Sequence, residues 1–185
     1  MEIKGSAVKA TPDFVREKYP QRFVEWLEML PPSSKTILDQ QIYSTNWYNL
    51  FDSVIVPTQK VADMFFNGNH KEAALEIGRY SADVALKGVY KMFVRVSSPQ
   101  FVLSRASNIF SAYYNPSEIK IIESKDKKCV LQFLKFQKKE ELIMYRIAGW
   151  IEHTLEITLK SPLKVEVHSE DLGMNVKTNI LVEWN

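Results

Sequence analysis

The sequence predicts an α+β domain in which a mainly helical part, residues 1–115, precedes a ββαββ unit, residues 116–185. Apolar residues recur at helical spacing through much of the first part, whereas alternating and β-type runs flank one helical stretch in the second. Four strands in that order most simply form an antiparallel sheet with the helix packed on it. Because no linker or repeat of fixed period divides the 185 residues, we expect a single domain.

The helical part is expected to open with a short strand over Glu2–Val8 and to become helical at Thr11–Pro12. Threonine is a common N-cap residue, and proline fits the first turn of a helix. A second helical segment with an amphipathic stripe follows over Pro20–Leu30 and ends at the two prolines behind it. A further helix starts at Pro57–Thr58 and is expected to end in left-handed backbone at residues 67–69.

The stretch Lys71–Phe93 predicts the helix around which the domain is organised, because most of its circumference is apolar. Its charged residues form one narrow stripe, and its small residues lie on the opposite side. The small side comprises Ala74, Gly78, Ser81, Ala85 and Gly88. Small residues let another backbone approach closely. The occupant of this face stays open among a neighbouring helix, a second copy of the chain and a ligand.

Turn signals predict the elements that follow. Ser98–Pro99 begins a helix that should continue to Asn115. Glu140–Thr158 returns to helical spacing and ends before Pro162. The strands of the ββαββ unit are expected at Glu118–Ser124, Lys128–Phe136, Leu163–His168 and Val176–Trp184, the first two as a hairpin around a lysine-rich turn.

The composition argues against a nucleic-acid-binding, membrane-spanning or secreted protein, but it does not identify a partner. The net charge is +2 and no extended basic cluster is present, so we expect no nucleic-acid partner. No run approaches the about 20 apolar residues that span a bilayer, and the first residues do not have the pattern of a signal peptide. We therefore expect a cytoplasmic protein without a membrane span. Cys129 is the only cysteine, which excludes an intrachain disulfide.

Signatures of catalysis and metal binding are missing from the sequence. The histidines His70, His153 and His168 have no metal-ligand spacing. No phosphate-binding glycine loop and no nucleophile elbow occurs. The carboxylate pairs at residues 140–141 and 170–171 are expected in solvated turns. The sequence thus predicts a protein that is not an enzyme, with no catalytic residue, metal site or cofactor.

Four polar residues on otherwise apolar helices are candidates for a ligand pocket. Arg79 and Arg105 would each place a cation among apolar neighbours, which requires a carboxylate partner, contact with solvent or an anionic ligand. Tyr80 and Tyr113 add hydroxyl groups to apolar surroundings, as a small-molecule pocket requires. An internal carboxylate such as Asp83 is the simpler partner for these cations, and an ordinary core stays open as an alternative to the pocket.

Short motifs are spread over nearly the whole chain. They are Lys4-Gly5-Ser6, Leu30-Pro31, Trp47-Tyr48, Leu75-Glu76-Ile77-Gly78-Arg79, Ser98-Pro99, Ala148-Gly149-Trp150 and Val182-Glu183-Trp184. In this order they resemble an uncharacterised bacterial family, known only as a domain of unknown function. That family is similar to the superfamily of 4-vinyl-reductase-type domains and haem-based nitric-oxide-binding domains.

The resemblance implies an α+β fold with N-terminal helices and an antiparallel sheet crossed by a helix. It also implies a sensor or adaptor module that binds a small, often apolar ligand between helices and sheet. The haem-binding relatives use a proximal histidine on a helix and a Y-x-S-x-R motif for the haem propionates. This sequence departs from both features, because Ser104–Arg105 lacks the preceding pattern and His153 falls on the wrong helix. No haem ligation is therefore expected at any residue.

We accordingly expect a non-enzymatic small-molecule-binding or signalling domain that does not bind haem. Its apolar pocket should lie between the helix of residues 71–93, the helix that starts at Ser98 and the sheet. The residues expected to bind a small apolar or anionic ligand are Arg79, Tyr80, Arg105 and Tyr113. The alternative is a homodimeric protein-interaction module with no ligand. An enzyme with dispersed catalytic residues is a third hypothesis, suggested only by the name of one related group.

Overall fold

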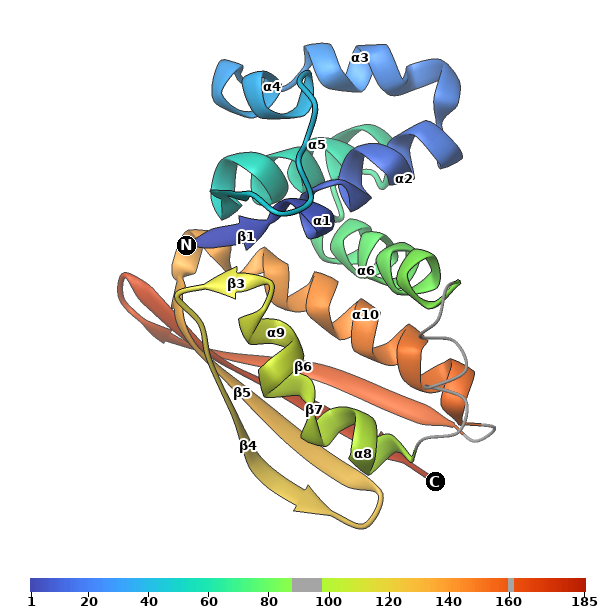
Figure 1. Cartoon of the computed structure of the whole chain (residues 1–185), viewed down its shortest axis with the longest axis vertical. Coiled ribbons are helices and arrows are strands. Elements are labelled where there is room, and N and C mark those ends of the chain that lie inside the picture. Colours follow the sequence, from blue (N-terminus) through green and yellow to red (C-terminus); the bar gives the residue numbers. More distant parts are fainter. Residues whose placement is uncertain (88–97, 160–161) are drawn as a thin grey trace.

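Residues 1–87, 98–159 and 162–185 are described in the computed structural model, in which helices cover antiparallel sheets (Figure 1). The N-terminal half forms a helical lobe at the top of Figure 1, and the C-terminal half forms a larger sheet with a long helix laid across it. This arrangement confirms the predicted α+β class. None of the helices in the described ranges combines the length and the apolarity that a membrane span requires.

The N-terminal lobe is built from short elements. The strand predicted over Glu2–Val8 is shorter, because Gly5 already starts a helix, and a Cβ atom at Gly5 would lie 2.1 Å from the carbonyl oxygen of Tyr43. The helix predicted from Thr11–Pro12 begins one residue earlier and buries Thr11 in its first turn. The elements are β1 (Glu2–Lys4), α1 (Gly5–Val8), α2 (Ala10–Lys18), a 3₁₀ turn (Pro20–Arg22), α3 (Phe23–Glu28), α4 (Pro32–Leu38), β2 (Trp47–Asn49), a π-helical turn (Phe51–Ile55) and α5 (Val56–Phe65).

Left-handed backbone separates α5 from α6 (His70–Leu86), as the sequence predicts. Asn67 and Gly68 have φ values of 51° and 78°, and the N–H group of Gly68 donates to a carbonyl oxygen of α5 at 3.0 Å. The side chain of Asn69 accepts a hydrogen bond from a first-turn N–H group at 3.2 Å and so caps α6. The helix predicted over Lys71–Phe93 is thus confirmed as far as Leu86, where α6 ends with Lys87 as its C-cap, and the residues from 88 onward lie outside the described ranges.

Two short helices stand where the sequence suggested one. Ser98 caps α8 (Pro99–Ser104), the chain bends at Arg105, and α9 (Ala106–Ser111) follows. The prediction of one continuous helix to Asn115 was therefore wrong. The reason is local: Arg105 has a ψ value of 0°, which departs from the value of a regular helix.

Two antiparallel sheets are present among the described residues. The smaller has the order β2-β1-β3, where β3 (Tyr114–Asn115) pairs with β1. It was not predicted, and it ties the start of the chain to the segment behind α9. The larger has the order β4-β5-β7-β6 and confirms the predicted four-stranded antiparallel sheet. Its strands are β4 (Glu118–Lys125), β5 (Lys128–Gln137), β6 (Leu163–Leu172) and β7 (Asn175–Trp184).

Helix α10 (Leu142–Thr158) lies between α6 and the larger sheet (Figure 1). On another side, Phe110 of α9 bridges α10 and the sheet, because its ring centroid lies 6.3 Å from that of Trp150 and 5.6 Å from that of Phe133 in β5. Burying one large apolar side chain stabilises a fold by about 1.5–3 kcal/mol. The inward residues predicted for this helix include four that are at most 3% exposed, namely Ile143, Ile147, Ile151 and Leu155.

The small face of α6 packs directly on α10. A Cβ atom at Gly78 would lie 2.1 Å from the carbonyl oxygen of Arg146, and one at Gly149 would lie 2.2 Å from the carbonyl oxygen of Leu75. No side chain fits at either position while the helices keep this separation. A neighbouring helix therefore occupies the small face, which was one of the three open alternatives, although Ala85 near the end of α6 is exposed.

Replacing Gly78 with alanine should separate α6 from α10 and lower the free energy of unfolding by about 2 kcal/mol, as overpacking of a core does. Alanine favours a helix over glycine by about 1 kcal/mol. The measured loss of stability is therefore the cost of overpacking reduced by this gain. Chemical denaturation measures it. Ala85→Leu on the exposed side of α6 is the control and should leave stability nearly unchanged. A Gly78→Ala variant as stable as the wild type would contradict the close contact.

Candidate functional site around helix α10

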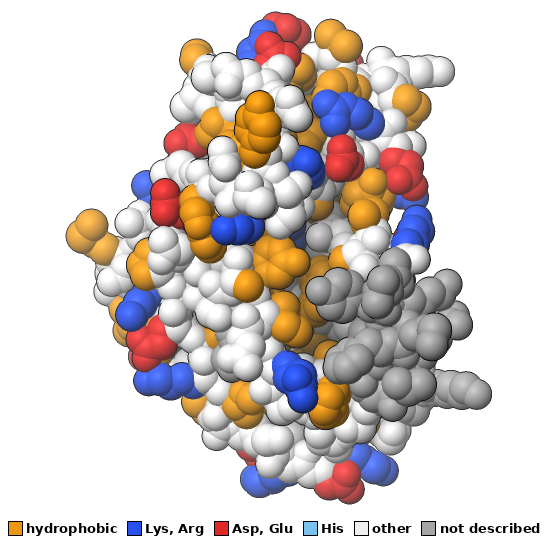
Figure 2. Space-filling model, in the orientation of Figure 1, with side chains coloured by type: hydrophobic (Ala, Val, Ile, Leu, Met, Phe, Trp, Pro, Cys, Tyr) orange, Lys and Arg blue, Asp and Glu red, His pale blue; other side chains and the backbone are white. Residues whose placement is uncertain are grey.

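Helix α10 touches each of the features that could carry a function. One side meets α6 in a network of charges, another meets α8 and α9 at a small cavity, and a third presents a buried arginine to the N-terminal lobe. On the face shown in Figure 2, positive and negative side chains are interspersed with hydrophobic ones outside the grey residues. The described part of that face carries no large patch of one sign.

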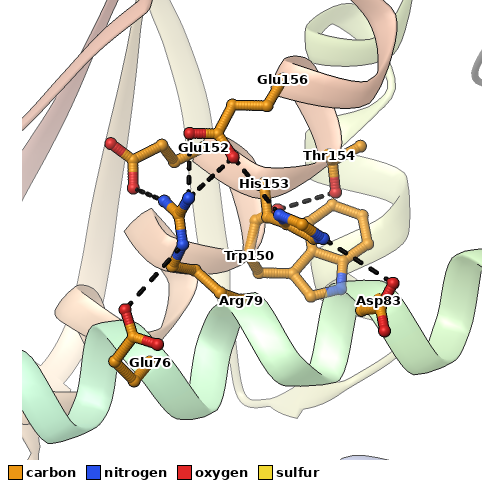
Figure 3. A network of polar contacts seen from close by, with 8 residues as sticks. All are labelled: Glu76, Arg79, Asp83, Trp150, Glu152, His153, Thr154 and Glu156. Atoms are coloured by element: carbon orange, nitrogen blue, oxygen red, sulfur yellow. Dashed lines mark hydrogen bonds and ion pairs between the residues drawn. The ribbon is translucent and has the colours of Figure 1, made fainter.

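Arg79 of α6 is paired with carboxylates of α10 (Figure 3). Its Nη1 atom donates to Glu152, and its Nη2 atom donates to both carboxylate oxygens of Glu156 at 2.8 and 3.0 Å. Burial by itself would lower the pKa of Arg79, but the hydrogen bonds and charges of these carboxylates raise it. The internal carboxylate partner exists, but it is not the suggested Asp83.

His153 extends the same network (Figure 3). Its Nδ1 atom lies 3.3 Å from Glu156, and its Nε2 atom lies 3.9 Å from a carboxylate oxygen of Asp83. Asp83 also accepts from Lys87 at 2.9 Å, and this bond is the main reason why the pKa of Asp83 is lowered. Within this network, the ion pairs of Arg79 with Glu152 and Glu156 hold α6 to α10. No group of residues in the described ranges has an arrangement that could hold a metal ion.

The other predicted ligand residues lie apart from Arg79. The Tyr80 hydroxyl donates to Glu17 of α2 at 3.0 Å, and burial together with that carboxylate raises the pKa of Tyr80 to about 12. Arg105 is exposed at the bend between α8 and α9, where its guanidinium lies 4.2 Å from the ring centroid of Phe101. The expectation that Arg105 shares a buried stripe was wrong, because the helix breaks at that residue. Tyr113 is 38% exposed just before β3.

A small apolar cavity lies between α8, α9 and α10. Its volume is about 10 Å³, roughly the space of one water molecule. The one hydroxyl on its wall, that of Thr154, donates to the backbone oxygen of Trp150 at 2.7 Å. The cavity lies near the predicted pocket, but none of the four predicted ligand residues lines it. Its walls are formed by Val102, Leu103, Ile109, Phe110, Trp150, Ile151, Thr154 and Leu155.

The sequence analysis missed Arg146, the most deeply buried Lys or Arg side chain that the structure describes. Its side chain leaves α10 toward the N-terminal lobe, and the residue is 5% exposed. The Nη1 atom donates to the hydroxyl of Thr11 at 3.3 Å, and Nη2 donates to the carbonyl oxygen of Ala7 at 2.5 Å. A signal was available, because Arg146 follows Ile143 by three positions and precedes Trp150 by four, which places it on the inward stripe.

Solved structures with a similar fold include H-NOX proteins. The chain is similar to the Fe(II) unliganded H-NOX protein from K. algicida, with 13% identity, a TM-score of 0.73, and coverage of 99% of this chain and 97% of that chain. A mutant of the T. tengcongensis H-NOX protein has 14% identity and a TM-score of 0.69, with coverage of 99% of this chain and 98% of that chain. The S. oneidensis H-NOX protein in the Fe(II)NO ligation state has 12% identity and a TM-score of 0.71, with coverage of 99% of both chains.

These comparisons decide how far the predicted resemblance holds. No family model and no curated protein matches the sequence. The similarity to haem-nitric-oxide-binding-like proteins is confirmed at the level of the fold, over the full length of the chain. The narrower bacterial family of unknown function receives no support.

The cavity beside α10 does not fit a haem group. Pockets for ligands of that size have volumes of several hundred Å³, whereas the interior cavity beside α10 measures about 10 Å³. Its wall contains no histidine, cysteine, methionine or tyrosine, the residue types that ligate haem iron. His70 and His168 lie on the exposed surface next to carboxylates, and Cys129 is buried within β5. A groove of about 370 Å³ lies over α4, but it is open and also lacks these ligands.

Arg79→Gln should lower the free energy of unfolding by about 1 kcal/mol, the upper range for partly exposed ion pairs. The loss should be smaller in concentrated salt, because salt screens exposed charges. Denaturation at low and high salt measures both effects. Arg22→Gln removes an exposed arginine–carboxylate pair within one short segment and is the matched control, with a smaller expected effect. Equal effects of the two substitutions would show that the network does not hold α6 to α10.

Proposed function

We propose that the chain is a non-enzymatic small-molecule-sensing domain whose ligand binds between α8, α9 and α10. The observation that carries the proposal is the apolar cavity in this position, within a fold shared over its full length with H-NOX proteins. One of those relatives is described with nitric oxide bound to its iron, so the fold accommodates a small ligand in that protein. Apolar walls with a single hydroxyl suit a small apolar molecule or the apolar end of a larger one.

Ligand entry has a structural consequence in this proposal. A molecule larger than water must displace lining side chains such as Leu103, Phe110 and Trp150, because the cavity has room for about one water molecule. Phe110 also contacts Phe133 of β5, so its movement reaches the sheet as well as α10. Packed cores respond to such a displacement by changing arrangement, since they have little room to deform gradually. The domain would thereby report the ligand to a partner as a sensor or adaptor.

Haem is not part of this proposal. We leave haem out because neither of the two cavities described above offers a haem ligand, and because the three histidines lie next to carboxylates. The protein would share the fold of the H-NOX proteins and sense a ligand held by side chains alone.

A homodimer is not included either. The small face of α6 suggested it, but at Gly78 that face packs on α10, which leaves no room for a second subunit at this position. The homodimer therefore stays a prediction without a surface assigned to it. Light scattering of the purified chain is its direct test.

Xenon dissolved under pressure is a suitable probe of the cavity, because dry apolar cavities bind it. We expect it to shift the methyl resonances of the lining residues Val102, Leu103 and Ile151 more than those of other core residues. Ile151→Phe should fill the cavity and abolish the shift.

Ile37→Phe on α4 is the control for this experiment, since Ile37 is partly buried and does not line the cavity. It should leave the xenon response intact. Uniform shifts throughout the core, or a response that survives in Ile151→Phe, would remove the basis of the proposal.

A further inference from the structure

The guanidinium group of Arg146 is buried without a charged partner among the described residues. Its acceptors there are the Thr11 hydroxyl and the Ala7 carbonyl oxygen, and both are neutral. A guanidinium group has five N–H donors, and these acceptors take two of them. Burial lowers the pKa of Arg146 from its ordinary value, and the only charge effect that opposes this is that of Tyr114.

No carboxylate in the described ranges offsets the charge. Arg146 forms no ion pair within the described ranges, and residues 88–97 and 160–161 contain neither Asp nor Glu. Tyr114 is not an anion at neutral pH, because burial raises its pKa to about 12. An unpaired buried charge costs several kcal/mol. Arg79, by contrast, is less buried and pairs with three carboxylates.

The groups around Arg146 come from three other elements of the fold. Thr11 of α2 and Tyr114 of β3 are buried beside it, and α1 supplies the Ala7 carbonyl. Apolar walls with a few convergent polar groups are typical of such sites. A guanidinium group in addition matches a carboxylate or a phosphate with two parallel hydrogen bonds.

The charge balance favours a carboxylate over a phosphate. Within the described part of the chain, no second lysine or arginine contributes to the electrostatics of Arg146. One buried cation neutralises a monocarboxylate completely. A phosphate monoester carries about −1.5 to −2 charges at pH 7 and would leave excess negative charge in an apolar site.

We propose that Arg146 anchors the carboxylate of a small monocarboxylic acid, whose apolar body lies in the interior between α10 and the elements α1, α2 and β3. This inference goes beyond the proposed sensing function, because it places a second ligand site on the side of α10 that faces the N-terminal lobe, apart from the cavity beside α8 and α9. The carboxylate replaces the Ala7 carbonyl as acceptor, because hydrogen bonds between charged groups are the stronger ones. Entry of the acid moves α1, a helix of only 4 residues, away from α10.

Calorimetric titration with octanoate below its micelle concentration tests the proposal in the full chain. We expect saturable binding of one octanoate, and no binding of 1-octanol, which has the same chain length without the charge. Arg146→Lys keeps the positive charge but loses the guanidinium group that can form two parallel hydrogen bonds with a carboxylate. It should weaken octanoate binding at least about tenfold, equivalent to about 1.4 kcal/mol. Arg79→Lys is the control, because Arg79 lies in the ion pairs with α10 carboxylates, and it should bind octanoate nearly as the wild type does.

Several results would overturn the proposal. Absence of octanoate binding would do so, as would equal affinity in the wild type and Arg146→Lys. Tighter binding of octyl phosphate than of octanoate would refute the assignment to carboxylates. Arg146→Met, if it folds, should lose octanoate binding entirely, and retention of binding would show that Arg146 only fastens α1 and α2 to α10. The xenon experiment is independent of Arg146, so loss of octanoate binding with an intact xenon response would refute this inference alone.

Discussion

The direct backbone contact between α6 and α10 is the constraint on which the rest of the structure depends. Gly78 and Gly149 bring each helix within reach of a carbonyl oxygen of the other. This separation lets Arg79 reach Glu152 and Glu156 across the interface. It also fixes the rotation of α10, which decides what its other sides present. A larger side chain at either glycine would therefore disturb the charge network and the remaining faces of α10 together.

Those remaining faces have different chemistry. Toward α8 and α9, α10 presents Trp150, Ile151 and Leu155 to an apolar cavity. Toward the N-terminal lobe it presents Arg146, a cation without a counter-ion among the residues described. Because both belong to one rigid helix, a ligand that moves α10 at one face alters the contacts at the other. This coupling gives a physical basis for sensing without a metal or a catalytic group.

Features with local signals could be predicted from the sequence, and features decided by distant contacts could not. Periodicity predicted α6 and its small face, and Asn67 and Gly68 marked the end of α5, since both depend on residues close in sequence. The partner of Arg79 was missed because Glu152 lies 73 positions away, whereas Asp83 is on the same helix. Likewise the stripe that contains Arg146 is visible in the sequence, but the acceptors it meets are 135 and 139 positions away.

Native mass spectrometry of the chain purified from a bacterial host tests the central claim most directly. The claim is that this fold binds a small molecule by its side chains, without haem. The spectrum should show a non-covalent mass other than haem, which disappears on denaturation and is reduced in Arg146→Lys or Ile151→Phe. A chain that carries stoichiometric haem, or one whose native and denatured masses are identical even after incubation with octanoate, would contradict the account.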